Sequence, residues 1–365
     1  MSHHDHFSPD YQTARDKFRS ACAEAGVAVT NWLHSMRGMQ DEALATDTAW
    51  IGPIDASRVL VTCSGTHGVE GHYGSGCQVG FLRDGHHRNL PADTAVLMIH
   101  ATNPYGFSWT RRVNEDNIDI NRNFIDFDQP LPQNPGYAEL ADAFVPADAN
   151  AATMAAADAR IAEYGRRHGD AALRLATSGG HYAHPLGMFY GGTRPAWSRL
   201  TMEAILAEFG LRERALVAAL DFHTGAGPFG YCEPIYSGDP AHPGCARLQR
   251  WIGPAMTIQR DGKSATPPQV GLSSDLWERS CGPNAAYVSF EYGTVPTDEV
   301  IGSLRAEHIL HRQGRNDWHE PGVQAVKQRL LNAFAPDRPE WREMVILQAR
   351  MLIERVARGV SAELA

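Results

Sequence analysis

The chain has 365 residues, of which 43% are hydrophobic and 21% charged, a composition typical of a globular protein with a substantial core. Its formal net charge of −9 argues against nucleic acids or anionic membranes as partners recognised through bulk positive charge. No apolar run is long enough to predict a membrane span. The six cysteines are scattered without a Cys-x-x-Cys pair, which favours reduced thiols and a cytoplasmic protein.

The N-terminal third predicts the start of an α/β fold. Residues 1–7 lack the apolar core of a signal peptide and are expected to form an exposed tail. Residues 9–50 are expected to form a helix followed by a connection. A buried strand over 58–64, a glycine-spaced helix over about 71–84 and a second buried strand over 95–100 follow. This strand–helix–strand order is typical of a parallel sheet.

The segment Ser64–Gly71 directly follows the first predicted buried strand. It places His67 and Glu70 between glycines at the carboxyl end of that strand, where open α/β sheets bind their ligands. An imidazole and a carboxylate at this spacing can bind the same zinc ion. With 17 histidines in the chain, about one His-x-x-Glu pair is expected by chance, so the motif needs support from other parts of the chain.

A second polar cluster spans residues 103–124 and shows little regular periodicity, which predicts a long loop with fixed turns. Arginine in such a loop can hold a carboxylate through two parallel hydrogen bonds, and asparagine adds further donors. A salt-bridged surface loop explains the stretch equally well when it is considered alone.

The middle of the chain, over 128–180, is rich in alanine and aspartate and predicts a helical insertion. The segment 179–192 is rich in glycine and aromatic residues, which suits a loop that lines a pocket. A helix over about 196–209 and a strong strand over 215–222 follow.

Two later strands end in residues that bind metals or transfer protons. His223 follows the strand over 215–222, and Glu291 follows a strand over 285–290. Because the carboxyl ends of parallel strands meet at one edge of the sheet, we expect His223 to join His67 and Glu70 as a third metal ligand. Asp221, or alternatively a backbone carbonyl, is expected to orient a ligand imidazole by a hydrogen bond to its other ring nitrogen.

Amphipathic helices near 296–313 and 340–357 are expected to cover the sheet, and neither internal repeats nor a Gly/Ser linker divide the chain. The predicted fold is therefore a three-layer α/β/α arrangement with a mostly parallel, mixed sheet. The predicted organisation is a single domain over 1–365, with a catalytic core at about 50–313, a helical insertion at about 128–180 and C-terminal helices at about 321–358.

Five motifs, in order, resemble the zinc carboxypeptidase superfamily, which includes carboxypeptidase A-like peptidases and the succinylglutamate desuccinylase and aspartoacylase deacylases. The motifs are His67-Gly68-Val69-Glu70, Asn103-Pro104-Tyr105-Gly106-Phe107, Arg112-x-Asn114 with Asp119–Phe124, His223, and Phe290–Thr294. The segments Ser64–Gly71 and Pro185–Gly192 further resemble a bacterial branch known mainly as a domain of unknown function.

The resemblance implies a role for each matching residue. One Zn²⁺ per chain would be bound by His67, Glu70 and His223. Arg112 would face the developing oxyanion, and Glu291 would act as general base and acid. Asn121 and Arg122 would hold a substrate carboxylate, while the substrate-capping tyrosine has three candidates: Tyr190, Tyr236 and Tyr292.

The sequence thus predicts a zinc-dependent hydrolase that cleaves an amide bond next to a free carboxylate, a carboxypeptidase or peptide amidase acting on small peptides. A deacylase that releases an acyl group from an N-acylated amino acid would use the same residues. A non-catalytic binding protein on the same fold is a third alternative, against which the intact ligands and Glu291 argue.

Overall fold

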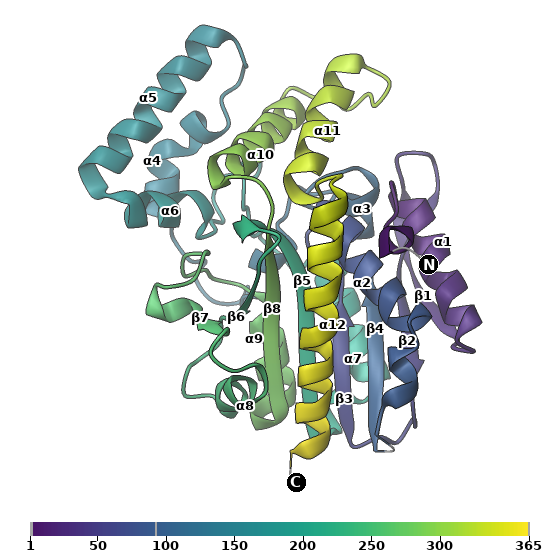
Figure 1. The fold of residues 1–365 in the computed structure, drawn as a ribbon. Coiled ribbons are helices and arrows are strands. Elements are labelled where there is room, and N and C mark those ends of the chain that lie inside the picture. The colour runs from purple at the N-terminus through teal and green to yellow at the C-terminus, as the bar shows by residue number, and fades with distance from the viewer. Residues whose placement is uncertain (1–2, 92, 364–365) are drawn as a thin grey trace.

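The computed structural model describes residues 3–91 and 93–363. A mixed β-sheet lies at the centre of the fold (Figure 1). The strands are β1 (Val29–Arg37), β2 (Ala43–Ile51), β3 (Arg58–Cys63), β4 (Thr94–His100), β5 (Leu216–Phe229), β6 (Cys232–Tyr236), β7 (Thr257–Ile258) and β8 (Ala285–Gly293). They are ordered β1-β2-β4-β3-β5-β8-β6-β7. The central strands β4, β3, β5 and β8 are parallel, whereas β1, β2 and β6 pair antiparallel to their neighbours on the central side.

The parallel centre forms because its strands are apolar on both faces. All seven residues of β4 are buried, and so are five of the six in β3. Strands of this kind are stable only where helices cover both faces of the sheet.

Helices cover both faces of the sheet, and a third group of helices lies beyond the ends of the strands. The α-helices are α1 (Tyr11–Glu24), α2 (Gly71–Arg83), α3 (Pro104–Ser108), α4 (Pro135–Phe144), α5 (Ala151–His168), α6 (Asp170–Ser178), α7 (Trp197–Glu208), α8 (Pro243–Ile252), α9 (Ser273–Cys281), α10 (Thr297–Arg312), α11 (Pro321–Phe334) and α12 (Pro339–Ala362). Helices α1, α2, α8 and α12 share one hydrophobic cluster with the sheet, and α7 and α9 share another. The predicted three-layer α/β fold is therefore confirmed.

The remaining long helices stand above the sheet in Figure 1 and share a separate hydrophobic cluster. This cluster joins α4, α5 and α6 to α10 and α11. The three former helices lie in the region predicted as a helical insertion, and together with α10 they overhang the carboxyl ends of the central strands.

Two predictions for the N-terminal region are wrong. Residues 29–51 form the antiparallel strands β1 and β2 instead of a connection, and β1 is a largely exposed edge strand without the apolar alternation that would have predicted it. His6 and Phe7 are buried rather than part of an exposed tail, while residues 1–2 lie outside the described part of the chain.

Two further observations concern the surroundings of the protein. All six cysteines are free and buried. Within the described residues, every helix is too short or too polar to cross a membrane.

Candidate metal centre and active site

The turn that follows β3 is fixed by close backbone contacts. Gly68 packs so tightly on α3 that an added Cβ would lie 2.0 Å from the carbonyl carbon of Gly106, so no other residue fits without a shift. The backbone N–H of Gly68 donates to the carbonyl of Arg112, and that of Val69 donates to the carbonyl of Arg111. The two sequence clusters around residues 67–70 and 111–112 are thereby joined.

Strand register brings the later residues to the same place. In the parallel pair of β5 and β8, His223 lies directly beside Glu291. On the other side of β5, Cys63 at the end of β3 pairs with Asp221, two residues before His223, so the turn with His67 begins level with this part of β5. The predicted convergence of strand ends is the arrangement found.

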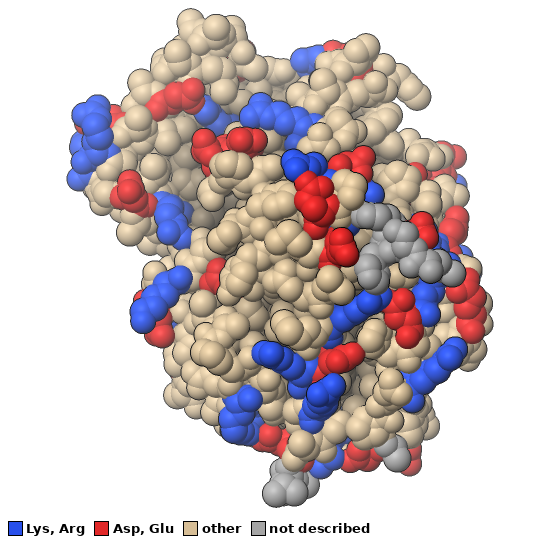
Figure 2. Space-filling model, viewed as in Figure 1, with Lys and Arg blue, Asp and Glu red and all other residues tan. Residues whose placement is uncertain are grey.

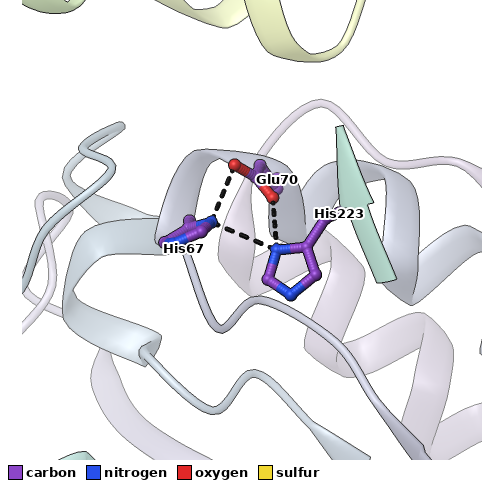
Figure 3. Close-up of side chains that lie close together, drawn as sticks. All are labelled: His67, Glu70 and His223. Atoms are coloured by element: carbon purple, nitrogen blue, oxygen red, sulfur yellow. Dashed lines mark hydrogen bonds and ion pairs between the residues drawn. The ribbon is translucent and has the colours of Figure 1, made fainter. Parts of the chain in front are cut away.

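His67, Glu70 and His223 form a buried cluster of candidate metal ligands, which we call the metal cluster. Their ligand atoms all lie within 4.8 Å of one another (Figure 3). The Nδ1 atom of His67 lies 2.9 Å from Oε1 of Glu70 and 3.2 Å from Nδ1 of His223. The Nδ1 atom of His223 lies 3.1 Å from Oε2 of Glu70. Two imidazole nitrogens and a carboxylate oxygen therefore face a common point, which is the donor set of a three-ligand zinc site.

Each histidine of this cluster has a buried carboxylate behind it. Nε2 of His67 lies 3.2 Å from Asp119, and Nε2 of His223 lies 3.0 Å from Asp221. Asp221 is itself held by hydroxyl groups of Thr66 and Tyr287. Such carboxylates fix the ring orientation and leave the opposite nitrogen to face a metal. The residues present thus fit a metal ion.

The charges of the cluster shift its acid–base equilibria. Burial raises the pKa of Glu70, but the charge of His67 and the hydrogen bond with His223 outweigh burial, and the pKa lies well below its usual range. Burial likewise opposes the charged form of His223, yet Asp221 and Glu70 hold the pKa of that imidazole well above its usual range. The carboxylates around the two imidazoles therefore favour positive charge at this point, as a cation site requires.

Arg112 lies against the proposed ligands and lines the adjoining cavity. Its Nε donates to Asp119 at 3.0 Å, its Nη1 donates to Glu70 at 3.1 Å, and its Nη2 lies 2.7 Å from Nε2 of His67. The guanidinium also lies 5.0 Å from the ring centre of Phe189. These contacts place its positive charge at the metal cluster.

Glu291 is buried at the end of β8 and also lines the cavity. Its Oε1 accepts a hydrogen bond from the backbone N–H of Ala226 at 3.0 Å. Burial, and then the negative charge of Glu70, raise the pKa of Glu291 to about 8. This is the environment of a carboxyl group that exchanges protons near neutral pH.

Asn121 and Arg122 line the same cavity from the turn after Asp119. Oδ1 of Asn121 accepts from the backbone N–H of Ser273, which leaves its Nδ2 for a ligand. The guanidinium of Arg122 is buried and donates to the carbonyls of Asn121 and Ser178, and its Nε has no hydrogen-bond partner among the described residues. Burial lowers the pKa of Arg122 to about 10, against the opposing effect of Asp119.

The structure does not bring the proposed substrate-binding tyrosines to the cavity. Tyr190 is buried in the hydrophobic cluster that contains α7 and α9, and Tyr292 packs against Tyr73 in the cluster on the opposite face of the sheet. Tyr236 is buried in that opposite cluster too. Successive side chains of a strand point to opposite faces of the sheet, so Tyr292 points to the face opposite to that of its neighbour Glu291. The tyrosine that does line the cavity is Tyr287.

The sequence also left two site residues unassigned. Asp119 contacts Arg112, seven residues before it, and His67, 52 residues before it, whereas Phe189 contacts Arg112 from far along the chain. No spacing rule connects Asp119 to His67, and the signal in the sequence was its place as the first residue of the Asp119–Phe124 part of the recognised motif.

A cavity of about 920 Å³ opens over the metal cluster. Its walls come from α5, α6, α10, the segment 259–272 and the ends of β5, β6 and β8. In the space-filling view the surface is hollowed between the lobe formed by α4–α6 and the body of the molecule (Figure 2). Arg174 on α6 donates to the carbonyl of Ala265 at 2.6 Å and so closes one side of the cavity.

Comparison with known proteins identifies a family but no activity. A family model described as "Protein of unknown function (DUF2817)" matches residues 7–348. No curated protein matches the chain.

Solved structures that match the chain include several hydrolases. Carboxypeptidase A from Helicoverpa armigera is 14% identical, with 91% of this chain and 75% of that chain covered and a TM-score of 0.46. A metallo-carboxypeptidase from Burkholderia cenocepacia is 12% identical, with 87% and 68% covered and a TM-score of 0.40. The succinylglutamate desuccinylase from Chromobacterium violaceum is 14% identical, with 91% and 76% covered and a TM-score of 0.37. Because these TM-scores are below 0.5, we argue the function from the side chains of the site.

Proposed function

The chain belongs to the DUF2817 family, whose description names no activity, and we propose that it is a zinc-dependent hydrolase that cleaves an amide bond next to a free carboxylate. The observation that carries this proposal is the convergence of His67, Glu70 and His223 on one point, with Glu291 beside them at the floor of a cavity. A structural ion cluster would not need a proton-exchanging carboxyl group at an open cavity.

The residues around this point have complementary tasks. When bound, zinc would supply a water of lowered pKa and polarise the amide carbonyl. Glu291 takes a proton from the attacking water and passes it to the leaving amine. Arg112 stabilises the negative charge that develops on the carbonyl oxygen, a contribution typically worth about 3–4 kcal/mol of barrier.

The other end of the substrate is an anion. Asn121 offers an amide donor that no described residue uses, and the buried Nε of Arg122 has no partner in the described part of the chain, which is costly unless a ligand acceptor pairs with it. A carboxylate fits both groups. The contact between Arg174 and Ala265 closes the cavity nearby, which suits the end of a chain better than a polypeptide that passes through.

Two substrate types carry an amide bond next to a free carboxylate. A small peptide with a free C-terminus is our first assignment, and an N-acylated amino acid is the alternative. A panel of dipeptides and N-acyl amino acids, each as free acid and as amide, distinguishes them. A deacylase turns over the N-acyl amino acids and spares the dipeptides.

The metal test measures zinc in purified protein. We expect close to one zinc per chain, lost in His67→Ala and in His223→Ala because each removes one of three ligands. The exposed His319→Ala variant is the matched control and keeps its zinc. Full zinc content in His67→Ala would exclude the proposed site.

The substrate test compares free acids with their amides in the panel. Wild-type protein should prefer the free acid by at least about 10²-fold in kcat/KM, since an amide leaves charged donors poorly paired. Arg122→Ala should lose most of this preference, and Asn121→Ala serves as a second variant if Arg122→Ala does not fold. Equal turnover of acids and amides would contradict the carboxylate site. Zinc binding without hydrolysis of any compound would indicate a binding protein instead.

A further inference from the structure

The cavity has two walls of different chemistry. One wall comes from β6, β8 and the segment 259–272 and carries, among apolar residues such as Ile235 and Leu272, the polar lining side chains Ser237, Gln259, Thr266, Gln269, Tyr287 and Ser289. The other wall is apolar and comes from α5, α6, α10 and their neighbours, with the lining side chains Phe144, Ile161, Leu173, Val300, Ile301 and Leu304. We call these the polar wall and the apolar wall.

The apolar wall is accessible but is not used by the proposed chemistry. Ile161, Leu173 and Ile301 are only partly buried, and each packs on the hydrophobic cluster shared by α4–α6, α10 and α11. Three separate helices therefore present aliphatic side chains to one space. Pockets lined in this way bind the apolar parts of ligands.

Two charged groups at the apolar wall, Arg305 and Asp158, are paired with each other, whereas Asp170 and Asp298 at this wall are exposed. Arg305 donates to the carbonyls of Phe144 and Ala143 at 2.9 and 2.7 Å, and it forms an ion pair with Asp158. Its donors are thus engaged with the protein, which excludes this arginine as the binding site of a second anion.

The two walls adjoin different residues of the proposed site. Asn121, the proposed carboxylate contact, is bonded to Ser273 at the end of the polar wall. The apolar wall comes close to His223 and Glu291: α10 directly follows the strand of Glu291, and an added Cβ on Gly225, two residues after His223, would lie 2.8 Å from Phe334. A substrate whose carboxylate is held at Asn121, next to Ser273, would leave the space beside Phe334 and α10 for its acyl side.

We propose that the apolar wall binds a large apolar group on the acyl side of the cleaved amide. This assignment rests on the proposed function and narrows its substrates to those with an apolar acyl group next to a carboxylate-bearing amine. Such a group is either a fatty acyl chain or the side chain of an apolar residue. Hydrolysis adds the elements of water across the C–N bond and releases the apolar acid and the free amine.

Binding and turnover are measured separately so that the two proposals can fail separately. Binding is measured by calorimetry on zinc-loaded Glu291→Gln, with N-acetyl, N-hexanoyl and N-decanoyl derivatives of one amino acid and with Ala and Phe dipeptides of the same amino acid. Turnover of the same compounds is measured on wild-type protein. Each buried methylene changes affinity by about fourfold, so the decanoyl derivative should bind at least about tenfold more tightly than the acetyl derivative.

The outcomes divide as follows. Tighter binding of the decanoyl derivative alone identifies a fatty acyl chain, and tighter binding of the Phe dipeptide alone identifies an apolar residue; both support the proposal. Equal affinity across both series overturns it, whether or not the compounds are hydrolysed. Length-dependent binding without turnover overturns the proposed hydrolase and leaves the apolar site standing.

Variants of the wall test the location of this site. Ile161→Gln and Ile301→Gln should each lower the ratio of decanoyl to acetyl affinity by about threefold or more. Leu175→Gln is the matched control, because Leu175 is 49% exposed on α6 and does not line the cavity. If the glutamine variants do not fold, Ala162→Trp narrows the cavity from the exposed side of α5 and should also lower the ratio. An unchanged ratio in the folded variants overturns the assignment.

Discussion

Arg111 and Arg112 are neighbours in the chain, yet they lead into two buried charge clusters of different character. Arg112 belongs to the metal cluster of His67, Glu70 and His223. Arg111 belongs to a second cluster, which we call the closed cluster, whose other members are Asn117, Glu307 and Lys327.

Every charged group of the closed cluster has its partner inside the cluster. Glu307 on α10 accepts from Nε of Arg111 at 2.7 Å and from Nζ of Lys327 on α11 at 2.7 Å. Arg111 also donates to Asn117 at 2.9 Å. The cluster thus fastens the loop after α3 to two helices, and no member of it lines the cavity.

The comparison shows that a shifted pKa does not identify a catalytic group by itself. The pKa of Glu307 and that of Glu70 both lie well below the usual range, because neighbouring cations outweigh the effect of burial. What separates the two carboxylates is the direction of their partners. Around Glu70 several ligand atoms face one point beside a cavity, whereas around Glu307 each donor ends on an acceptor.

The largest expected effect is on turnover at the metal cluster. Glu291→Gln keeps the shape of the side chain and removes the proton acceptor, so turnover should fall by at least about 10²-fold. Zinc content and the free energy of unfolding should change little, because Glu291 is not one of the three proposed ligands. Kinetic assays, zinc analysis and urea unfolding on one preparation measure all three, and near-normal turnover would exclude the assigned role.

The opposite pattern is expected at the closed cluster. Glu307→Gln leaves Arg111 and Lys327 buried without a counter-charge, which typically costs about 3–5 kcal/mol in the free energy of unfolding. Zinc per folded chain should stay near the wild-type level, and turnover should fall far less than in Glu291→Gln. Urea unfolding measures the loss, and a cost below about 1 kcal/mol would show that the closed cluster is not structural.

The pH dependence of this cost has a definite sign. The pKa of Glu307 is lower in the folded protein than in the unfolded chain, so its carboxylate stabilises the fold above the unfolded pKa, and this contribution is lost as the pH falls. The difference in stability between wild type and Glu307→Gln should therefore shrink below about pH 4.5. Both proteins are compared without metal, because acid also protonates zinc ligands.

The sequence predicted the metal cluster better than the closed cluster for a physical reason. His67 follows the buried strand β3, and His223 and Glu291 lie in the later halves of β5 and β8. Parallel strands bring these parts to one edge of the sheet whatever their separation in the chain. Arg111 and Glu307 lie 196 residues apart on a loop and a helix face, and only the tertiary packing of α10 and α11 brings them together.

The fold shows the same division between local and long-range signals. The ranges predicted for β3, α2, α10 and the start of β5 agree with the structure to within a few residues, because apolar runs and helical spacing mark them locally. The short strands β6 and β7 and the helices α8 and α9 were not predicted. Strand β6 has five residues, and its pairing is set by contact with β8, which lies more than 50 residues further along the chain.

The smallest expected effect is the loss of stability in Lys327→Met, and this loss should grow as the pH rises above 8. Burial lowers the pKa of Lys327 to about 8, so holding its ammonium group in the fold has a cost that its bond to Glu307 only partly offsets. Lys327→Met removes that cost and leaves Glu307 paired with Arg111, so the loss of stability at pH 7 should be about 1 kcal/mol or less.

As the pH rises above 8 the folded wild type releases the proton of Lys327 while the unfolded chain still binds it, and wild-type stability therefore rises relative to Lys327→Met. Urea unfolding of both proteins between pH 7 and 10 tests this directly. A gap that closes instead of widening would show that Lys327 is bound more tightly as a cation than its burial allows.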